Sequence, residues 1–148
     1  ACEEGGIEIW ADPHNEDIRF TRVRARKNVL PILEENLGPG ITEALARSSD
    51  LLRDDADALD GFATEFFNQV DPLNLEVKDL ERLPKAIRSR VLRLAIYKAG
   101  APAGSLSAEH IAATEALISD WHGQKEVALP GNVKLLRNSG RIILSTHN

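Results

Sequence analysis

The clearest periodic element of the sequence is the stretch from Ile41 to Val70, ITEALARSSDLLRDDADALDGFATEFFNQV. Apolar residues recur in it at steps of three, four and seven, which is the spacing of one stripe along an α-helix. The stripe consists of Ile41, Leu45, Leu52, Ala56, Leu59, Ala63, Phe66 and Val70. The other face carries Asp50, Asp54, Asp57 and Asp60, which we interpret as a solvated face. The pattern predicts a helix ~45 Å long, with Gly61 as a candidate break.

Upstream of this stretch, a second helical segment is predicted from Glu16 to about Leu37. The glycines and proline at 38–40 end it, and Pro31 predicts a kink or two consecutive helices because proline has no backbone N–H to donate. Before Glu16 the sequence indicates a loop with one short strand over residues 7–10. Few neighbouring residues could form a second strand to pair with it, so we expect it to belong to a sheet elsewhere.

Downstream, Pro72 ends the long helix, and short elements follow in quick succession. We expect an extended piece at 73–77, a helical turn at 80–83, a helix from Pro84 to about Ala99, and a helix capped by Ser107 that ends near Trp121. In the C-terminal tail the apolar residues change from a helical to a strand period, and turn residues lie at 131–132 and 138–140. This pattern predicts three short strands. The expected fold is therefore mainly α, with a long linker helix and a small C-terminal antiparallel β-meander.

Composition sets limits on the kind of protein this can be. Its 148 residues are 43% apolar and 28% charged, enough for one ordinary core and not a disordered chain. The net charge of −5 argues against a surface that binds polyanions uniformly. A single cysteine excludes a disulfide framework and a cysteine-based zinc site, and it fits a reducing compartment. The absence of methionine suggests either processing or a piece of a longer protein.

No stretch approaches the ~18 consecutive apolar residues of a membrane span, so we expect no membrane contact and a cytoplasmic location. No site of catalytic or metal-binding spacing is evident in the histidines, which are scattered. The aspartates at 54, 55 and 57 lie on a predicted helix without a loop glycine, so we interpret them as solvated rather than as a calcium loop.

The basic residues are distributed unevenly and form two clusters. The first cluster comprises Arg19, Arg22, Arg24, Arg26 and Lys27, and no acidic residue lies among them. The second comprises Arg82, Lys85, Arg88, Arg90, Arg93 and Lys98. In the second, an expected buried arc of Ile87, Val91, Leu94 and Ala95 leaves Arg90, Arg93 and Tyr97 together on the opposite side.

Two arginines beside an aromatic side chain suit phosphate and base contacts in a nucleic acid. Cations this close repel one another, so we expect a polyanion or a carboxylate surface to face them. The alternatives are that the cations pair with the acidic helix at 41–70 or bind an acidic protein partner. Composition does not distinguish these alternatives.

The segment Trp10–Pro31, WADPHNEDIRFTRVRARKNVLP, resembles the bacterial tRNA(Ile)-lysidine synthetases. That family shares a Trp, Asp and Asn element, then Thr/Tyr-Arg-x-x-x-Arg and a Leu-Pro pair. The remainder of the chain is similar more loosely, including the arginine-rich stretch at 80–93 and the turn at 129–131.

The resemblance implies an ATP-dependent ligase that joins L-lysine to the wobble cytidine of an isoleucine tRNA anticodon. In that family a PP-loop domain with a Ser-Gly-Gly-x-Asp-Ser motif binds ATP, with Mg²⁺ expected beside it, and this motif is absent from the sequence. We therefore expect this chain alone to be inactive and to hold no cofactor. The implied domains are the tail of the catalytic domain at 1–17, a linker helix at 18–40 and a tRNA-binding domain at 41–148.

The resemblance also points to individual residues. Asp12 and Asn15 match the family's Asp-x-x-Asn element, which lies close to the active pocket, where a carboxylate could hold the lysine ammonium. The residues themselves equally suit an Asx turn with a helix cap. Candidates for tRNA contact are Arg22, Arg24, Arg26, Arg88, Arg90 and Arg93.

Two other functions fit the same sequence. One is a non-catalytic helical adaptor whose acidic and basic helices bind protein partners. The other is self-association as a homodimer through the apolar stripe of the 41–70 helix, with Phe62, Phe66 and Phe67 in the interface.

Overall fold

The computed structural model describes residues 12–124 and 126–146, so the strand expected at 7–10 lies outside the described residues. The chain divides into two compact units, residues 1–53 and 54–148, and the division falls within one long helix. Each unit is described by itself below. The domain boundaries expected after residues 17 and 40 stay predictions.

In the first unit a 3₁₀ turn, Pro13–Asn15, precedes a helical run made of three parts. These are α1 (Thr21–Arg24), a π-helical turn (Ala25–Val29) and α2 (Leu30–Leu37). The run begins at Thr21 rather than at the expected Glu16. The Asp17 carboxylate accepts the backbone N–H of Arg19 at 2.9 Å, and this local bond competes with helix formation.

Pro31 does not interrupt this run with a break between two helices. Instead, the backbone widens into the π-helical turn just before the proline, which accommodates the missing N–H. The run then ends, as expected, at Gly38, whose φ of 100° is a conformation that glycine adopts readily.

The predicted long helix is confirmed as α3 (Ile41–Phe67), and it continues through Gly61. The expected break at Gly61 is therefore wrong. A glycine costs a helix only about 1 kcal/mol relative to alanine. Packing of the neighbouring Ala63, Phe66 and Phe67 against the core of the second unit offsets that cost. Of the three phenylalanines considered for a dimer interface, only Phe62 is exposed, because Phe66 and Phe67 pack against the core.

The start of α3 is capped by a side chain from α2. The Glu34 carboxylate accepts the backbone N–H of Thr42 at 2.7 Å and that of Gly40 at 2.8 Å. These are N–H groups that lack a partner at a helix N-terminus. Hydrogen bonding from Thr42 is the main reason that the pKa of Glu34 lies below its ordinary value of 4.5.

This cap predicts a pH-dependent helix start. Because the pKa of Glu34 is lowered by folding, its contribution is complete above pH 4.5 and is lost as the pH falls through the lowered pKa. Amide hydrogen exchange at Gly40 and Thr42 should therefore accelerate, relative to the intrinsic rate, on acidification. Glu34→Gln should remove this pH dependence, whereas Glu35→Gln, at an exposed neighbour, should keep it. Equal protection in wild type and Glu34→Gln at all pH values would contradict the cap.

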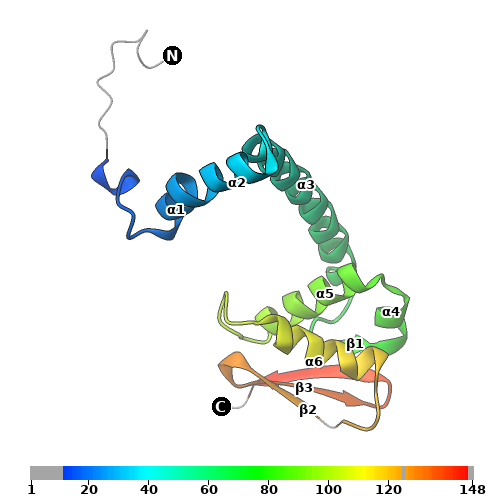
Figure 1. The fold of residues 1–148 in the computed structure, drawn as a ribbon. Coiled ribbons are helices and arrows are strands. Elements are labelled where there is room, and N and C mark those ends of the chain that lie inside the picture. The colour runs from blue at the N-terminus through cyan, green and yellow to red at the C-terminus, as the bar shows by residue number, and fades with distance from the viewer. Residues whose placement is uncertain (1–11, 125, 147–148) are drawn as a thin grey trace, which may run out of the picture. The chain divides into compact units, whose positions relative to one another are not determined.

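The second unit combines the end of α3 with three further helices and a four-stranded antiparallel sheet (Figure 1). The helices are α4 (Val77–Arg82), α5 (Lys85–Lys98) and α6 (Ala108–Ser119). The strands are β1 (Asn74–Glu76), β2 (Glu126–Leu129), β3 (Val133–Asn138) and β4 (Arg141–Thr146), in the spatial order β1-β4-β3-β2. The mainly α fold with a small antiparallel sheet is thus confirmed.

The sheet is one strand larger than the expected meander. The extended piece at 73–77 becomes β1 and pairs with β4, with Leu75 opposite Ile142. This pairing joins residues far apart in the sequence, which no local pattern specifies. Both side chains are buried, so the pairing also brings the two halves of the core together.

The helix ends follow the expected local chemistry. The predicted cap at Ser107 is confirmed, since its Oγ accepts the backbone N–H of His110 at 3.3 Å. The His110 Nδ1 accepts the backbone N–H of Ser107 at 3.1 Å, which completes a reciprocal capping box. His110 is therefore a structural residue. Pro84 stands just before α5 rather than in its first turn.

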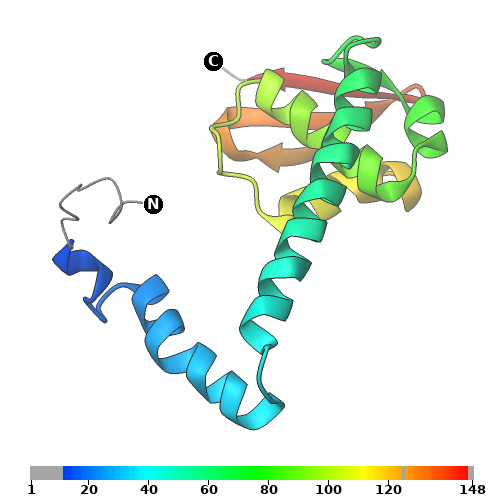
Figure 2. The ribbon, with the colours of Figure 1, turned by 90° about the horizontal axis from the view of Figure 1, so that it is seen from above.

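The core lies between the sheet and the helices α5 and α6, which cover one of its faces (Figures 1 and 2). Its fully buried members include Leu75, Leu80, Leu92, Ile96, Leu117, Leu135 and Ile142. The buried arc of α5 is rotated from the expected one: Val91 and Ala95 are buried, but Ile87 and Leu94 are only half-buried. None of the helices within residues 12–124 and 126–146 is long and apolar enough to cross a membrane.

Candidate nucleic-acid interface

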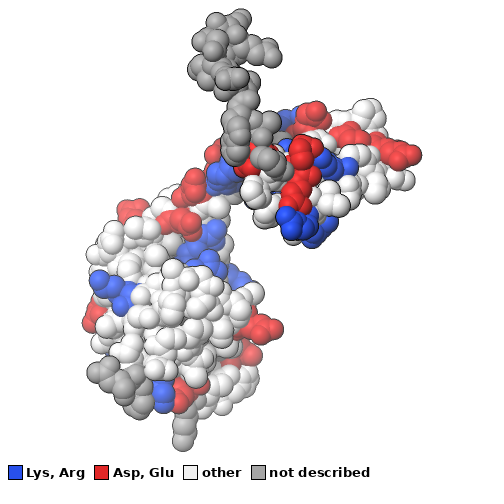
Figure 3. All heavy atoms as spheres, turned by 90° about the vertical axis from the view of Figure 1, so that its left-hand side faces the viewer, with Lys and Arg blue, Asp and Glu red and all other residues white. Residues whose placement is uncertain are grey.

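The first basic cluster is partly neutralised by the two acidic residues that precede it. Arg19 forms a bidentate pair with Asp17, with Nη2 at 2.7 Å and Nε at 2.9 Å from Oδ2. Glu16 pairs with Lys27 and, at 3.4 Å, with Arg26. Three of the five cations therefore face carboxylates of their own segment. These two acidic residues lie outside the cluster as defined from the sequence. Positive and negative side chains are accordingly interleaved on this unit (Figure 3).

The three candidate arginines of this cluster have different surroundings. Arg24 donates to the backbone carbonyls of Ile18 and Arg19, at 3.2 and 2.9 Å, and so fastens the loop before α1. Arg26 donates to the carbonyl of Asn15 at 2.5 Å. Arg22 lies 4.9 Å from the centre of the Phe20 ring, and no carboxylate pairs with it among the described residues. Arg22 is thus the most available cation of the three.

A shallow hollow of about 230 Å³ lies on this segment. Asn15, Arg22, Val23 and Arg26 line it, so the structure brings Asn15 together with two of the candidate arginines. Two guanidinium groups beside an amide can bind an anion such as a phosphate.

The neighbouring Asp12 forms the Asx turn that its sequence allows. Its Oδ1 accepts the backbone N–H of His14 at 2.9 Å and also lies 2.9 Å from the His14 Nδ1. The backbone N–H of His14 is the first reason that the pKa of Asp12 lies below its ordinary value, and the His14 ring is the second. The carboxylate is therefore ionised at neutral pH. Contact with a lysine ammonium stays a prediction.

In the second cluster, Arg88 points inward. Its Nε donates to the Glu115 carboxylate at 2.8 Å, and the Ser89 hydroxyl donates to the other oxygen of the same carboxylate at 2.9 Å. The side chains of Arg88 and Glu115 are only 11% and 7% exposed. This pair joins α5 to α6, which favours a structural role for Arg88 over the predicted contact with tRNA.

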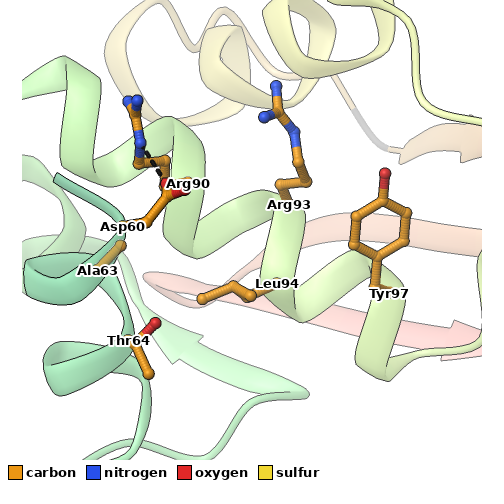
Figure 4. A pocket seen from close by; sticks show the side chains of 7 residues that line it. All are labelled: Asp60, Ala63, Thr64, Arg90, Arg93, Leu94 and Tyr97. Atoms are coloured by element: carbon orange, nitrogen blue, oxygen red, sulfur yellow. Dashed lines mark hydrogen bonds and ion pairs between the residues drawn. The ribbon is translucent and has the colours of Figure 1, made fainter. Parts of the chain in front are cut away.

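Arg90, Arg93 and Tyr97 do lie together, as the helical spacing predicts. They extend to the same side from successive turns of α5 (Figure 4). With Leu94 of the same helix they line a hollow of about 280 Å³, and Asp60, Ala63 and Thr64 of α3 complete it. This hollow is called the α3–α5 hollow below.

The two arginines of the α3–α5 hollow differ in their freedom. Arg90 Nε donates to Asp60 Oδ1 at 2.5 Å, and its Nη1 donates to the carbonyl of Ala86 at 2.9 Å. Pairing with the acidic helix, the alternative considered from the sequence, therefore holds for Arg90. Arg93 is exposed and has no carboxylate partner within residues 12–124 and 126–146. The hollow thus presents one fixed and one free guanidinium beside an aromatic ring.

The α3 side of this hollow was not predicted. Asp60 was interpreted as part of a solvated face, and Thr64 was not considered. The residues at 60, 63 and 64 share one face of a helix by their spacing alone. That this face meets α5 follows only from the tertiary packing.

The described residues offer no donor set for a metal ion, because no group of three or more His, Cys, Asp or Glu side chains converges within them. The sequence also has no Ser-Gly-Gly-x-Asp-Ser loop. Within residues 12–124 and 126–146 the side chains therefore do not fit the Mg²⁺ that accompanies ATP. The arrangement is suited to binding an anionic ligand by arginine and an aromatic side chain.

Comparison with known proteins agrees with the resemblance noted from the sequence. Residues 75–143 match the family model described as the TilS substrate binding domain. The chain is 52% identical over 142 residues to the tRNA(Ile)-lysidine synthase of Thermobifida fusca (strain YX), an alignment that covers 95% of this chain and 44% of the relative.

Two further relatives carry the same name. The tRNA(Ile)-lysidine synthase of Leifsonia xyli subsp. xyli is 46% identical over 99% of this chain and 45% of its own length. That of Streptomyces coelicolor is 46% identical over 97% of this chain and 42% of its own length. The chain therefore spans less than half the length of these curated relatives.

Proposed function

We propose that the chain belongs to the tRNA(Ile)-lysidine synthase family and is the C-terminal, tRNA-binding part of such an enzyme, because residues 75–143 match the TilS substrate binding domain and two relatives of that name are 52% and 46% identical over nearly the whole chain. The parent enzyme would ligate L-lysine to the wobble cytidine of isoleucine tRNA with the use of ATP. The observation that carries the proposal for this chain is the pair of arginine-lined hollows, each combined with a side chain that can pack or hydrogen-bond beside a phosphate.

The distribution of charge supports selective rather than uniform binding. The chain has a net charge of −5, yet Arg22 and Arg93 present guanidinium groups that no described carboxylate neutralises. Phosphate contacts of this kind fix the position of an RNA but do not identify its sequence. Reading of the anticodon would therefore depend on other parts of the enzyme.

ATP and its Mg²⁺ would bind to the PP-loop domain of the parent enzyme, and this chain alone would be inactive. Asp12 and Asn15 would lie at the edge of the lysine site, where the ionised Asp12 carboxylate could face the substrate ammonium. The Asx turn of Asp12 explains its local geometry equally well. Substitution Asp12→Asn in the parent enzyme, with KM for lysine as the readout, would separate the two roles.

Binding of isoleucine tRNA by this chain tests the proposal. Arg22→Ala combined with Arg26→Ala should lower the affinity about tenfold near 0.1 M salt, because it removes the guanidinium of Arg22, which no described carboxylate neutralises, and the less available one of Arg26, which Glu16 contacts at 3.4 Å. The slope of log K against log salt concentration should become shallower by about 1–2. Filter binding at several salt concentrations measures both quantities.

The matched control is Arg47→Ala with Arg53→Ala, which removes two exposed cations from the same unit. Arg53 already pairs with Asp50 at 3.0 Å, so its loss should change the affinity and the slope less. Equal effects of the two double variants would mean that only net charge matters. Unchanged tRNA affinity together with loss of a protein complex would favour the adaptor function instead.

A further inference from the structure

We propose that the α3–α5 hollow binds one unpaired nucleotide of the tRNA, with its base stacked on Tyr97 and its phosphate held by Arg93. The inference rests on the proposed function and makes it more specific, since it names the class of RNA element that this face recognises. It is carried by the geometry of four residues, Asp60, Arg90, Arg93 and Tyr97.

The aromatic side chain is the first step. Tyr97 is half-buried: it packs against the core and also lines the hollow. An aromatic side chain fixed on one side and open on the other is a platform for a base. Bases within a duplex have no free face, so stacking of this kind selects unpaired nucleotides.

The second step is the position of the cations. Arg90, Arg93 and Tyr97 occupy one face of α5 at intervals of three and four residues, a row about 10 Å long. Figure 4 shows the three side chains extending to the same side, with Leu94 lying across the base of the hollow toward Thr64. A nucleotide whose base lies on Tyr97 would thus place its backbone beside Arg93.

The third step is the role of Asp60. Its carboxylate holds Arg90 at 2.5 Å, so Arg90 is already oriented and partly neutralised before any RNA binds. Arg93, which is exposed and without a described partner, is left as the main phosphate ligand. One free guanidinium next to one aromatic platform matches a single nucleotide better than the long backbone track of a duplex. An acidic protein would use the arginines but would have no need of the open face of Tyr97.

The single tyrosine of the chain provides a direct test. Incorporation of 3-fluorotyrosine into the whole chain gives one fluorine resonance, from Tyr97. Titration with a short single-stranded RNA should shift this resonance by the ring current of the stacked base. A blunt-ended, fully paired RNA duplex with the same number of phosphates should leave it nearly unchanged.

Affinity measurements on variants complete the test. Tyr97→Ala should weaken binding of the single-stranded RNA about tenfold, whereas Tyr97→Trp should retain it. Arg93→Ala should weaken binding of both RNAs and reduce the salt slope by about 1. Circular dichroism of each variant shows whether it is folded, and retention of function by Tyr97→Trp excludes a purely structural effect.

The outcomes separate this inference from the proposed function. If the RNA binds with a clear salt slope but the resonance does not move, the inference is wrong and the proposed function stands. An equal shift with the fully paired duplex would also overturn it, as would a shift produced by polyglutamate but not by RNA. If neither the single-stranded RNA nor isoleucine tRNA binds to the chain, both the inference and the proposed function are wrong.

Discussion

Replacement of Glu115 by alanine is expected to lower the free energy of unfolding of the second unit by about 3–5 kcal/mol. The variant would leave the Arg88 guanidinium buried beside α6 without its carboxylate, whereas the Ser89 hydroxyl would keep the Lys85 carbonyl, at 2.8 Å, as an acceptor. Removal of one partner of a buried ion pair is costly because the other charge stays desolvated. Urea unfolding followed by circular dichroism would measure the loss.

A double-mutant cycle separates the ion pair from simple packing. Arg88→Leu combined with Glu115→Leu should be destabilised less than Glu115→Ala alone, because no unpaired charge is left and apolar volume is retained. The double variant should also keep its tRNA affinity if Arg88 has the structural role that its burial favours. A loss of affinity in a folded double variant would return Arg88 to the list of tRNA contacts.

Gly131→Ala is expected to destabilise the second unit by about 2–5 kcal/mol through backbone strain and overpacking together. Gly131 has a φ of 76° in the turn between β2 and β3. A Cβ there would lie 2.8 Å from the Pro102 ring, 2.9 Å from the carbonyl oxygen of Gly100 and 3.0 Å from the Cα of Ala101. These atoms belong to a backbone segment and a rigid ring, so they cannot move aside easily. Thermal and urea unfolding would measure the effect.

The turn between β3 and β4 offers a matched control. Gly140 has the same φ of 76°, but a Cβ there would meet nothing within 4 Å. Gly140→Ala should therefore cost only the left-handed backbone penalty of about 1–2 kcal/mol. The difference between the two variants isolates the close approach of the 100–102 loop to the β2–β3 turn. Equal destabilisation would show that this approach is not tight.

Much of the fold follows from local signals in the sequence. The apolar stripe of 41–70 predicts α3, the hydroxyl of Ser107 predicts the start of α6, and the alternating tail predicts β2 to β4. These features depend on residues within a few positions of one another, where helical and strand periods and cap chemistry operate. Gly61 was misjudged because a single glycine is a weak signal that tertiary packing overrides.

The candidate site was predicted only in part, because its residues come partly from one helix and partly from tertiary packing. The spacing of Arg90, Arg93 and Tyr97 on one helix is a local property, so the sequence places them together. Their partner Asp60 lies 30 positions from Arg90, on a different helix.

The sequence by itself thus determined most of the helices and strands, the two basic clusters and the family to which the chain is similar. Only the tertiary structure decided which cations are neutralised. Arg88 and Arg93 are both arginines of the same helix, and the sequence does not distinguish them. Arg88 is nevertheless buried against Glu115 of α6, whereas Arg93 is exposed to solvent. The physical reason is that an ion pair between helices depends on how their faces pack, and that packing is set by the whole core rather than by any local pattern.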